Sequence, residues 1–544
     1  MQFFDALTAE KLQSFRWWDR GSFAEMPWNG VVADAHRAGL GLRRAGIRPG
    51  VPVACVLTNS FEVVRGMLGV WLAGAAVASL PVPARAMSIE DYASQLVSIC
   101  RHLGSRVLLI EDRLIEALRG PIDGEVELVG WSSLPVGGSF EPTPPGDDEP
   151  AFIQYSSGST SRPKGCVLTP RAMGIQLKMI GDMLEAAPED SFSSWLPLSH
   201  DMGAFGCLLF PWAYDLPLAL SSPERFVVDP RTWLGDIAEF GATISAGPPS
   251  ALNIATRAER RNPLPGSLRR LKSCVIGGES ISWSVLEAAT EAFAPKGLSA
   301  EMWMPAYGMA EATLVVSSID IAARPSFRRV DSAALAGEEV VYVDGHGEGT
   351  TEIVSTGRPR GEAGVRVEEP DRLSQIHVRS PCLATEYHRE EELTAERFSG
   401  GELATGDLGF MHEDELYVVG RRDDMLSVGG RNVYAREIES AVDLLDAVRS
   451  GCSTVIDAGA GNRARLVMLL ELRDEGADLG MLAAEASRTA KRKAGVLLDE
   501  CVFLPPGALP KTPSGKIQRF RCRHLLATDV FEPLDRVKLK RAGG

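Results

Sequence analysis

The sequence predicts an α/β protein with a large N-terminal domain, built on mixed and largely parallel sheets between helices, and a small C-terminal α/β domain. Residues 31–130 alternate helical periodicity with short apolar runs, a pattern typical of the crossover units of parallel sheets. The chain of 544 residues is 45% hydrophobic, enough for one large core and at least one smaller core. The alternation begins again after Asp424. We therefore expect domains at 1–422 and 423–544.

The first elements follow from the periodicity of apolar residues. We expect an amphipathic helix at 31–45, a strand at 51–57, a helix ending at Ala73, a strand at 76–80, a further helix, and a strand at 107–110. The uncharged run 66–83 is long enough to raise the question of a membrane span. Its five glycines and prolines favour a buried helix, a turn and a buried strand instead. Residues 134–150, rich in Gly and Pro, predict a surface connection.

Composition excludes several classes of protein. The 57 basic and 72 acidic residues give a net charge of −15, which argues against nonspecific binding to nucleic acid or to an anionic membrane. Nine cysteines are scattered without metal-ligand spacing, so we expect reduced and mostly buried thiols. The N-terminus lacks a basic region before an apolar core, so we expect no signal peptide. We therefore expect a cytoplasmic protein without a membrane span; the sequence does not indicate its oligomeric state.

A loop between two short apolar runs, 151–153 and 166–168, has the composition of a phosphate-binding site. Small residues let consecutive backbone N–H groups approach an anion, and hydroxyls and a lysine add donors. The residues concerned are Ser156, Ser157, Gly158, Ser159, Thr160 and Lys164. A solvated hairpin would explain the turn but not a lysine between Pro163 and Gly165. A P-loop is excluded because no Ser or Thr follows a Gly-Lys pair.

Further segments along the chain carry polar side chains or glycines at strand ends. After the loop, Thr169 and Pro170 predict a helix start. His200 and Asp201 lie between an apolar strand end and a glycine-punctuated helix. The segment VIGGES, 275–280, is a strand that ends in two glycines, and PAYGMAEAT, 305–313, follows it. Taken alone, a lone histidine is more often structural, and Tyr307 and Glu311 could equally be core and surface residues.

The C-terminal part begins with the block LATGDLGFMHEDELYVVGRRDDMLSVGG, 403–430. A helix after Tyr434 is then expected, with strands at 452–456 and 464–472, a helix at 482–494 and a strand at 500–504. The segment LPKTPSGKIQR, 509–519, is predicted to be an exposed loop because of its prolines and glycine. A salt-bridged turn at 407–423 is the structural alternative to a binding site there.

Taken in order, these segments resemble the motifs of the adenylate-forming (AMP-binding) superfamily over residues 31–522. The resemblance is closest to fatty acyl-AMP ligases and acyl-CoA synthetases, which carry a similar His-Asp-Met-Gly run. It implies ATP and Mg²⁺ as cofactors. It assigns nucleotide binding to the loop residues above and to Gly277, Gly278, Glu279, Tyr307, Gly308, Asp407 and Arg421.

The resemblance also implies individual roles. The Tyr307 ring would stack on adenine, Asp407 would bind the ribose diol, and Arg421 would reach the ribose or the α-phosphate. Glu311 and Thr160 would hold Mg²⁺, which needs few protein oxygens. Lys516 would be the catalytic lysine, with Lys511 a weaker candidate, and Asp423 would be the hinge. Together with Lys516 and Glu311, His200 is a candidate catalytic residue, expected to act as a wall and gate of the acyl pocket. Further pocket candidates are Trp195, Met202, Phe205, Leu252, Gly277 and Ala306.

Two features bear on the acceptor of the acyl group. The interval between Tyr307 and Gly357 is long, and around 326–351 it contains a predicted strand pair. Fatty acyl-AMP ligases have an insertion here that is thought to brace the two domains and disfavour CoA. Departures from the family pattern are Ala435 in place of a proline, and Ser380-Pro381 and Glu386-Tyr387 in place of glycine-containing pairs. They leave the substrate and the acceptor open.

The resemblance implies ATP-dependent activation of a fatty or other apolar carboxylic acid to acyl-AMP, with release of pyrophosphate. We expect transfer to the phosphopantetheine thiol of an acyl carrier protein supplied in trans, in lipid, polyketide or other secondary-metabolite biosynthesis. The alternatives are an acyl-CoA ligase that uses CoA, or adenylation with thiolation by a separate enzyme. From another class, a catalytically inactive acyl- or nucleotide-binding homologue or an oxidising luciferase could share the fold.

Overall fold

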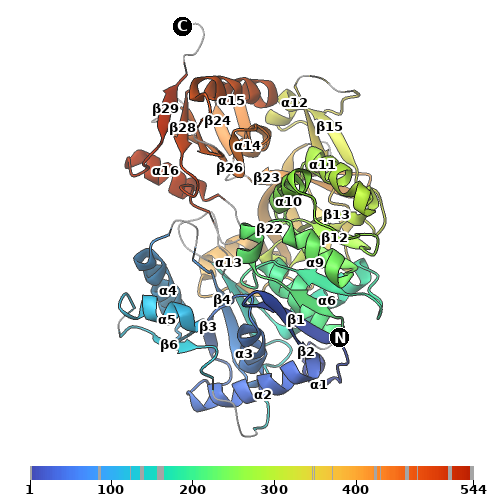
Figure 1. Cartoon of the computed structure of the whole chain (residues 1–544), viewed down its shortest axis with the longest axis vertical. Coiled ribbons are helices and arrows are strands. Elements are labelled where there is room, and N and C mark those ends of the chain that lie inside the picture. The colour runs from blue at the N-terminus through green and yellow to red at the C-terminus, as the bar shows by residue number, and fades with distance from the viewer. Residues whose placement is uncertain are drawn as a thin grey trace.

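The computed structural model describes residues 3–83, 87–122, 124–134, 140–155, 164–345, 347, 349–369, 372–421, 425–428, 431–459, 465–473, 476–511 and 517–539. Its larger N-terminal part contains two large sheets and one smaller sheet, and a C-terminal α/β unit lies above this body in Figure 1. The expected α/β class is confirmed.

The seven-stranded sheet contains the strands predicted near the start of the chain. Its order is β20 (Glu386–Tyr387), β8 (Gly165–Leu168), β7 (Phe152–Tyr155), β4 (Ala76–Leu80), β3 (Pro52–Val56), β5 (Val107–Ile110) and β6 (Glu127–Gly130). Pairs from β7 to β6 are parallel, whereas β20, β8 and β7 pair antiparallel. Successive side chains of a strand point to opposite faces, so each face of this sheet needs apolar cover. Helices α2 (Trp28–Arg44) and α3 (Phe61–Leu72) pack on one face, and α4 (Ile89–Leu103) and α5 (Asp112–Arg119) pack on the other.

The nine-stranded sheet forms the centre of the body. Its order is β17 (Arg358–Pro359), β14 (Val315–Ser318), β13 (Trp303–Gly308), β12 (Ser273–Ile276), β11 (Ile244–Gly247), β9 (Phe192–Ser194), β10 (Leu218–Leu220), β1 (Ser14–Asp19) and β2 (Ser22–Pro27). Neighbours from β13 to β1 are parallel.

Helices and short helical turns surround these strands. They are α1 (Asp5–Thr8), α6 (Pro170–Met183), the π-helix η1 (Met202–Leu209), α7 (Phe210–Ala213), α8 (Pro223–Val228), α9 (Thr232–Phe240), α10 (Pro249–Arg261), α11 (Trp283–Phe293), η2 (Ala294–Lys296), η3 (Ala300–Met302) and η4 (Ala310–Ala312). The helix start predicted at Thr169 is confirmed, since its side chain accepts a hydrogen bond from the Ala172 N–H and Pro170 is the first helical residue. Buried residues of both large sheets form one continuous core.

The smaller sheet of the body is antiparallel, and the segment around 326–351, expected from the sequence to be an insertion and called the insertion below, packs beside it. Its order is β18 (Gly364–Arg366), β19 (Ser374–Arg379), β22 (Glu402–His412) and β21 (Phe398–Ser399), with β23 (Glu415–Arg421) also paired to β22, and α13 (Glu391–Arg397) precedes β21. An antiparallel strand pair is present, formed by β15 (Phe327–Asp331) and β16 (Thr350–Val354). The stretch 330–345, where the pair was expected, instead contains the end of β15 and the helix α12 (Ser332–Ala336), because the second strand lies further along the chain. Val330, Leu335 and Val340 pack there with Leu408 and Phe410.

The C-terminal unit has cores of its own. A two-stranded pair, β24 (Met425–Val428) and β25 (Arg431–Tyr434), precedes a sheet of order β26 (Val448–Asp457), β27 (Leu466–Leu472), β28 (Glu500–Leu504) and β29 (Asp535–Lys538). One face packs on α14 (Ala435–Val442) and α15 (Leu479–Ala494), the other on α16 (Arg519–Ala527). Ala435, which replaces a proline of relatives, begins α14. The expected boundary at 423 lies outside the described residues.

Two expectations from composition can be compared with the structure. The uncharged run 66–83 forms the end of α3, a turn at Gly74 and the buried strand β4. In the part of the chain that the structure describes, no helix combines the length and the apolar character needed to cross a membrane. All nine cysteines are buried and free of disulfide bonds, as expected.

Candidate active site

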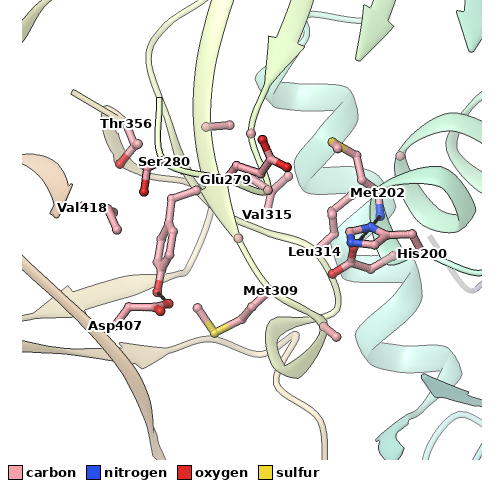
Figure 2. Close-up of a pocket in the computed structure, with 18 of the residues that line it drawn as sticks. His200, Met202, Glu279, Ser280, Met309, Leu314, Val315, Thr356, Asp407 and Val418 are labelled. Carbon is pink, nitrogen blue, oxygen red and sulfur yellow. Dashed lines mark hydrogen bonds and ion pairs between the residues drawn. The ribbon is translucent and has the colours of Figure 1, made fainter. Parts of the chain in front are cut away.

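A cavity of about 370 Å³ lies where the three sheets of the body meet the C-terminal unit. The strand ends of both large sheets open into it, which is the usual position of a ligand site in α/β folds. Its wall includes Tyr155 and Lys164 from the seven-stranded sheet, Gly277 and Tyr307 from the nine-stranded sheet, Asp407 and Arg421 from the antiparallel sheet, and Ala435, Arg436, Ile517, Gln518 and Arg519 from the C-terminal unit. Figure 2 shows Asp407 toward one end and His200 toward the other.

Asp407 is the centre of the polar end. The register of β22 and β23 places it opposite Arg421, whose Nε lies 3.1 Å from Asp407 Oδ1. The Tyr307 hydroxyl donates to Asp407 Oδ2 over 2.6 Å. Burial and the Asp407 charge hold the pKa of Tyr307 well above its ordinary value, so the phenol stays a neutral donor. The three residues assigned to adenosine are therefore neighbours.

Two glycines bring backbones together beside Tyr307. A Cβ on Gly277 would lie 2.8 Å from the Ala306 carbonyl oxygen, and one on Gly308 would lie 1.8 Å from that of Leu314. Both distances are too short for a side chain, so these positions require glycine. Gly278, with φ of +78°, and Glu279 follow in the same wall. The cavity wall beside Tyr307 is therefore formed by closely packed backbone without side chains at Gly277 and Gly308.

Glu311 and Lys164 both interact with Tyr387. The Tyr387 hydroxyl donates to Glu311 Oε1 over 2.9 Å, and Lys164 Nζ lies 5.8 Å from the centre of the Tyr387 ring. Burial and the Glu311 charge raise the pKa of Tyr387. In the sequence, Tyr387 stands out only because Glu386-Tyr387 replaces a glycine-containing pair. Its pairing with Cys166 in β8 places it beside the loop, and nothing in the local sequence indicates that pairing.

His200 stands at the opposite end, where the polar wall becomes apolar. Its Nδ1 lies 2.5 Å from Asp201 Oδ1, which also accepts from the Met202 N–H over 2.7 Å. Figure 2 shows His200 and Met202 together with Leu314 and Val315 between them and Asp407. The lining also includes Ile180 and Met183 of α6, which packs against the helix η1 that contains Met202, together with Leu184, Phe192, Ala246 and Val275. This end can hold an apolar group.

The acyl-pocket candidates divide into two groups. Met202, Gly277 and Ala306 line the cavity. Trp195, Phe205 and Leu252 are not among its lining residues. The Trp195 ring stacks on Phe226 with centroids 3.8 Å apart, Phe205 packs edge-on against Phe152, and Leu252 is a fully buried residue of α10. The apolar residues of α6 were missed because the face that meets a cavity has the same composition as a face that meets the core.

Several candidates lie outside the described residues: Ser156, Ser157, Gly158, Ser159, Thr160, Asp423 and Lys516. Their flanks are described. Tyr155, whose hydroxyl lies 3.2 Å from His102 Nδ1, and Lys164 line the cavity on either side of the first loop. Ile517, just after Lys516, lines it from the C-terminal unit.

The carboxylates among the described residues decide whether the cavity can hold Mg²⁺. Among them, no group of three or more His, Cys, Asp or Glu side chains could hold a metal ion by itself. Glu311 is the carboxylate next to Lys164 and the loop. Mg²⁺ keeps waters and substrate phosphates as ligands and is commonly bound through one or two carboxylates. The donor set therefore fits Mg²⁺ bound together with a nucleotide.

A family model described as AMP-binding enzyme matches residues 17–388, more than half of the chain. The chain belongs to this family. As an AMP-binding enzyme it is an adenylate-forming ligase, and two of its relatives have corresponding names. The putative fatty-acid–CoA ligase fadD25 of Mycobacterium tuberculosis is 29% identical, with 76% of this chain and 75% of the relative covered. The long-chain-fatty-acid–AMP ligase FadD26 of Mycobacterium bovis is 27% identical, with 95% and 94% covered.

Solved structures show the same fold. One from a study of fatty acyl-adenylate ligases of E. coli and L. pneumophila has a TM-score of 0.88 at 24% identity, with 97% of both chains covered. A fatty acyl-adenylate ligase from L. pneumophila in complex with acyl adenylate and pyrophosphate has a TM-score of 0.74 at 23% identity, with 99% of this chain and 98% of that chain covered. The AMP-binding enzyme thus has the adenylate-forming architecture, with a large N-terminal and a small C-terminal domain.

Proposed function

We propose that this AMP-binding enzyme uses ATP to convert a fatty or other apolar carboxylic acid into acyl-AMP and pyrophosphate. One observation carries the proposal. A single cavity joins a polar end, where Asp407, Arg421 and Tyr307 are in contact, to an apolar end that includes Ile180 and Met183. A nucleotide suits the first end and an acyl chain suits the second.

The reaction makes the acid a better acyl donor. A carboxylate oxygen attacks the α-phosphorus of ATP, the bond from that phosphorus to the bridging oxygen of the β-phosphate breaks, and pyrophosphate leaves with the electron pair. In this proposal Tyr307 packs on adenine, while Asp407 accepts from the ribose hydroxyls and Arg421 stays beside them. Lys164 and the loop 156–160 hold the β- and γ-phosphates. Charges that face the developing pyrophosphate stabilise the transition state.

Two groups complete the site. Glu311 and Thr160 would hold Mg²⁺, which supplies positive charge to the departing pyrophosphate. Lys516 would bridge the carboxylate and the α-phosphate oxygens, since the residue that follows it, Ile517, lines the cavity. We assign residues 1–422 to the body and 423–544 to a mobile cap, with Asp423 as the hinge.

For the acceptor we favour the phosphopantetheine thiol of an acyl carrier protein. The support is the insertion: α12 contacts both β25 and α15 of the C-terminal unit, and such contacts restrict how that unit can turn toward free CoA. A complete acyl-CoA ligase is the second candidate, favoured by the name of the relative fadD25. Lys164, Glu311 and Asp407 at one cavity argue against an inactive homologue.

The test is pyrophosphate release with a panel of acids that includes butyrate, dodecanoate, hexadecanoate and benzoate. Each acid is assayed without thiol, with CoA, and with a phosphopantetheinylated carrier protein. We expect release with an apolar acid and acyl transfer to the carrier protein. Thioester formation with CoA at a comparable rate would replace the carrier assignment by an acyl-CoA ligase. No release with any acid would contradict the proposed activity.

A further inference from the structure

Helix α10 presents a polar stripe to the C-terminal unit. Ser250, Asn253 and Arg257 are spaced by three and four residues and so share one face, while Ala251, Leu252 and Ala255 on the other face are buried in the body. Asn253 Nδ2 donates to Ser450 Oγ over 2.8 Å, and an Arg257 guanidinium nitrogen donates to the Asp443 backbone carbonyl over 2.7 Å. We call these interactions the α10 contact.

The α10 contact holds the irregular part of strand β26 at Gly451, where the pairing of β26 with β27 shifts register between Val448 and Ser453; we call this part of the strand the Gly451 turn. Gly451 has φ of +67°, and a Cβ there would lie 3.9 Å from the Ser250 Cβ, so the turn sits directly on the first turn of α10. That turn of α10 is tied to the cavity wall, because the Ser250 N–H donates to Glu279 Oε2 over 3.2 Å. Ser250 therefore contacts both the C-terminal unit, at Gly451, and a residue of the cavity wall, Glu279.

Lys511 connects the Gly451 turn to the loop that ends at Lys516. Its Nζ donates to the Gly451 carbonyl and lies 3.1 Å from Cys452 Sγ. Its backbone pairs with Ile517 in an antiparallel bridge, and the Gln518 N–H donates to the Pro510 carbonyl over 3.0 Å. The residues that flank 512–516 on the two sides are therefore bonded to each other, and one of them, Ile517, lines the cavity.

We infer that Asn253, Arg257 and Lys511 are positioning residues for the adenylation step: they seat the Gly451 turn on α10 and thereby hold the base of the Lys516 loop at the cavity. The inference rests on the proposed function. None of the three lines the cavity, so each acts through the loop and not on the substrate. A displacement of about 1 Å at a reacting group can cost a factor of about 10².

The contact is suited to one of two half-reactions. It consists of a few partly buried hydrogen bonds, which resemble those of transient interfaces between domains. Such a contact can open when the C-terminal unit turns to admit a thiol. Its loss should therefore slow formation of acyl-AMP and leave transfer from acyl-AMP intact.

The test is the double variant Asn253→Ala/Arg257→Ala, assayed with the acid that supports the fastest exchange of pyrophosphate into ATP. We expect kcat for exchange to fall about thirty-fold, since two hydrogen bonds of about 1 kcal/mol each are removed. KM for ATP and for the acid should change by less than about two-fold. Transfer from pre-formed acyl-AMP to the thiol acceptor should keep its rate. Lys511→Ala should reproduce this split, and Lys511→Arg, which keeps a donor, should restore part of kcat.

The matched control is Arg260→Ala. Arg260 lies on the same helix but bonds Glu291 and the Ala288 carbonyl within the body, so exchange should be unchanged. If the wild-type enzyme makes acyl-AMP, and the double variant and Lys511→Ala make it at the same rate, this inference is overturned while the proposed function stands. Equal losses in both half-reactions would also overturn it, because they indicate general destabilisation. Wild-type enzyme that makes no acyl-AMP with any acid would overturn the proposed function and this inference with it.

Discussion

Tyr387 is the residue whose role depends most on its surroundings. It donates to Glu311 and places its ring face near Lys164, so one side chain orients both an anion and a cation. A carboxylate that accepts a hydrogen bond from a fixed donor is held in one orientation. Tyr387 is therefore expected to fix Glu311 for metal binding.

Replacing Tyr387 with Phe removes the hydroxyl and leaves the ring. We expect a higher Mg²⁺ concentration for half-maximal pyrophosphate exchange, by about three- to ten-fold, since a hydrogen bond to a charged group contributes about 1.5 to 3 kcal/mol and water replaces part of it. The measurement is exchange rate against Mg²⁺ concentration at saturating ATP. The control Tyr417→Phe removes a similar bond, from Tyr417 to Glu415 over 3.3 Å, away from the cavity. Equal Mg²⁺ dependence in both variants would contradict the role of Tyr387.

Lys516 carries the most direct catalytic prediction. Removal of one charge that faces a transition state costs about 10² to 10³ in rate, so we expect Lys516→Ala to lower acyl-AMP formation by that factor. ATP affinity should change little, because Lys164, Asp407 and Arg421 remain. Exchange kinetics and ATP titration measure the two effects, with the exposed Lys538→Ala as the control. Near-normal exchange in Lys516→Ala would reject this assignment.

At the scale of elements, the junction of α14 and β26 contains a buried acid. Burial raises the pKa of Asp443 to about 7, and the nearby Glu439 charge acts in the same direction. A hydrogen bond from the Ser453 hydroxyl over 2.7 Å, the Gly451 N–H and the Lys511 charge act in the opposite direction. Since the carboxyl holds its proton more tightly in the folded state, stability falls as pH rises from about 4 to about 7.

Asp443→Asn should remove this pH dependence. The melting temperature of the variant minus that of the wild type should increase from pH 5 to above pH 7 and then level off, because the ionised Asp443 is the form that burial disfavours. Thermal unfolding across that pH range measures the difference. Asp446→Asn is the control, since Asp446 is exposed three residues later. A constant difference across the range would show that Asp443 does not titrate in the folded state in this interval.

The elements also show what the sequence can and cannot specify. Strand β4, at Ala76–Leu80, and strand β28, at Glu500–Leu504, have the predicted bounds, because short apolar runs between turn residues define a buried strand. A strand pair is also present in this region, as expected, but its second strand, β16, lies after the predicted stretch, and the pattern did not indicate the helix α12 between the two strands. Local pattern could not separate Trp195 and Phe205, which face the core, from Ile180 and Met183, which face the cavity. Both environments select apolar side chains, and only the tertiary arrangement distinguishes them.

At the scale of the whole molecule, the C-terminal unit touches the body at separate places. Among the described residues these include the α10 contact, the ion pair between Arg521 of α16 and Asp91 of α4 over 3.3 Å, and the contacts of α12 with β25 and α15. Figure 1 shows α12 at the upper edge of the body beside α15. The first two bear on the orientation that places Ile517 at the cavity. The third belongs to the insertion, so it can restrain the unit independently of the loop.

The insertion can be removed with little change to its base. Asp331 and Thr350 are partners in the register of β15 and β16, so an Asn-Gly turn can replace residues 332–349 and close the hairpin. We expect this variant to keep pyrophosphate exchange within about three-fold, because no lining residue is removed, and to gain thioester formation with CoA as the C-terminal unit loses its restraint. Acyl-CoA formed per acyl-AMP measures the gain.

A control separates the restraint from the loss of core. Leu335 packs with Leu373, Phe410 and Val419, so Leu335→Ala lowers stability by about 2 to 5 kcal/mol but keeps the insertion backbone. If lost packing alone opened the site to CoA, Leu335→Ala would gain thioester formation as the deletion does. A gain confined to the deletion assigns the choice of acceptor to the contacts of α12 with β25 and α15. Absence of any gain, with carrier-protein transfer intact in the deletion, would mean that the surface of the C-terminal unit, and not its freedom to turn, selects the acceptor.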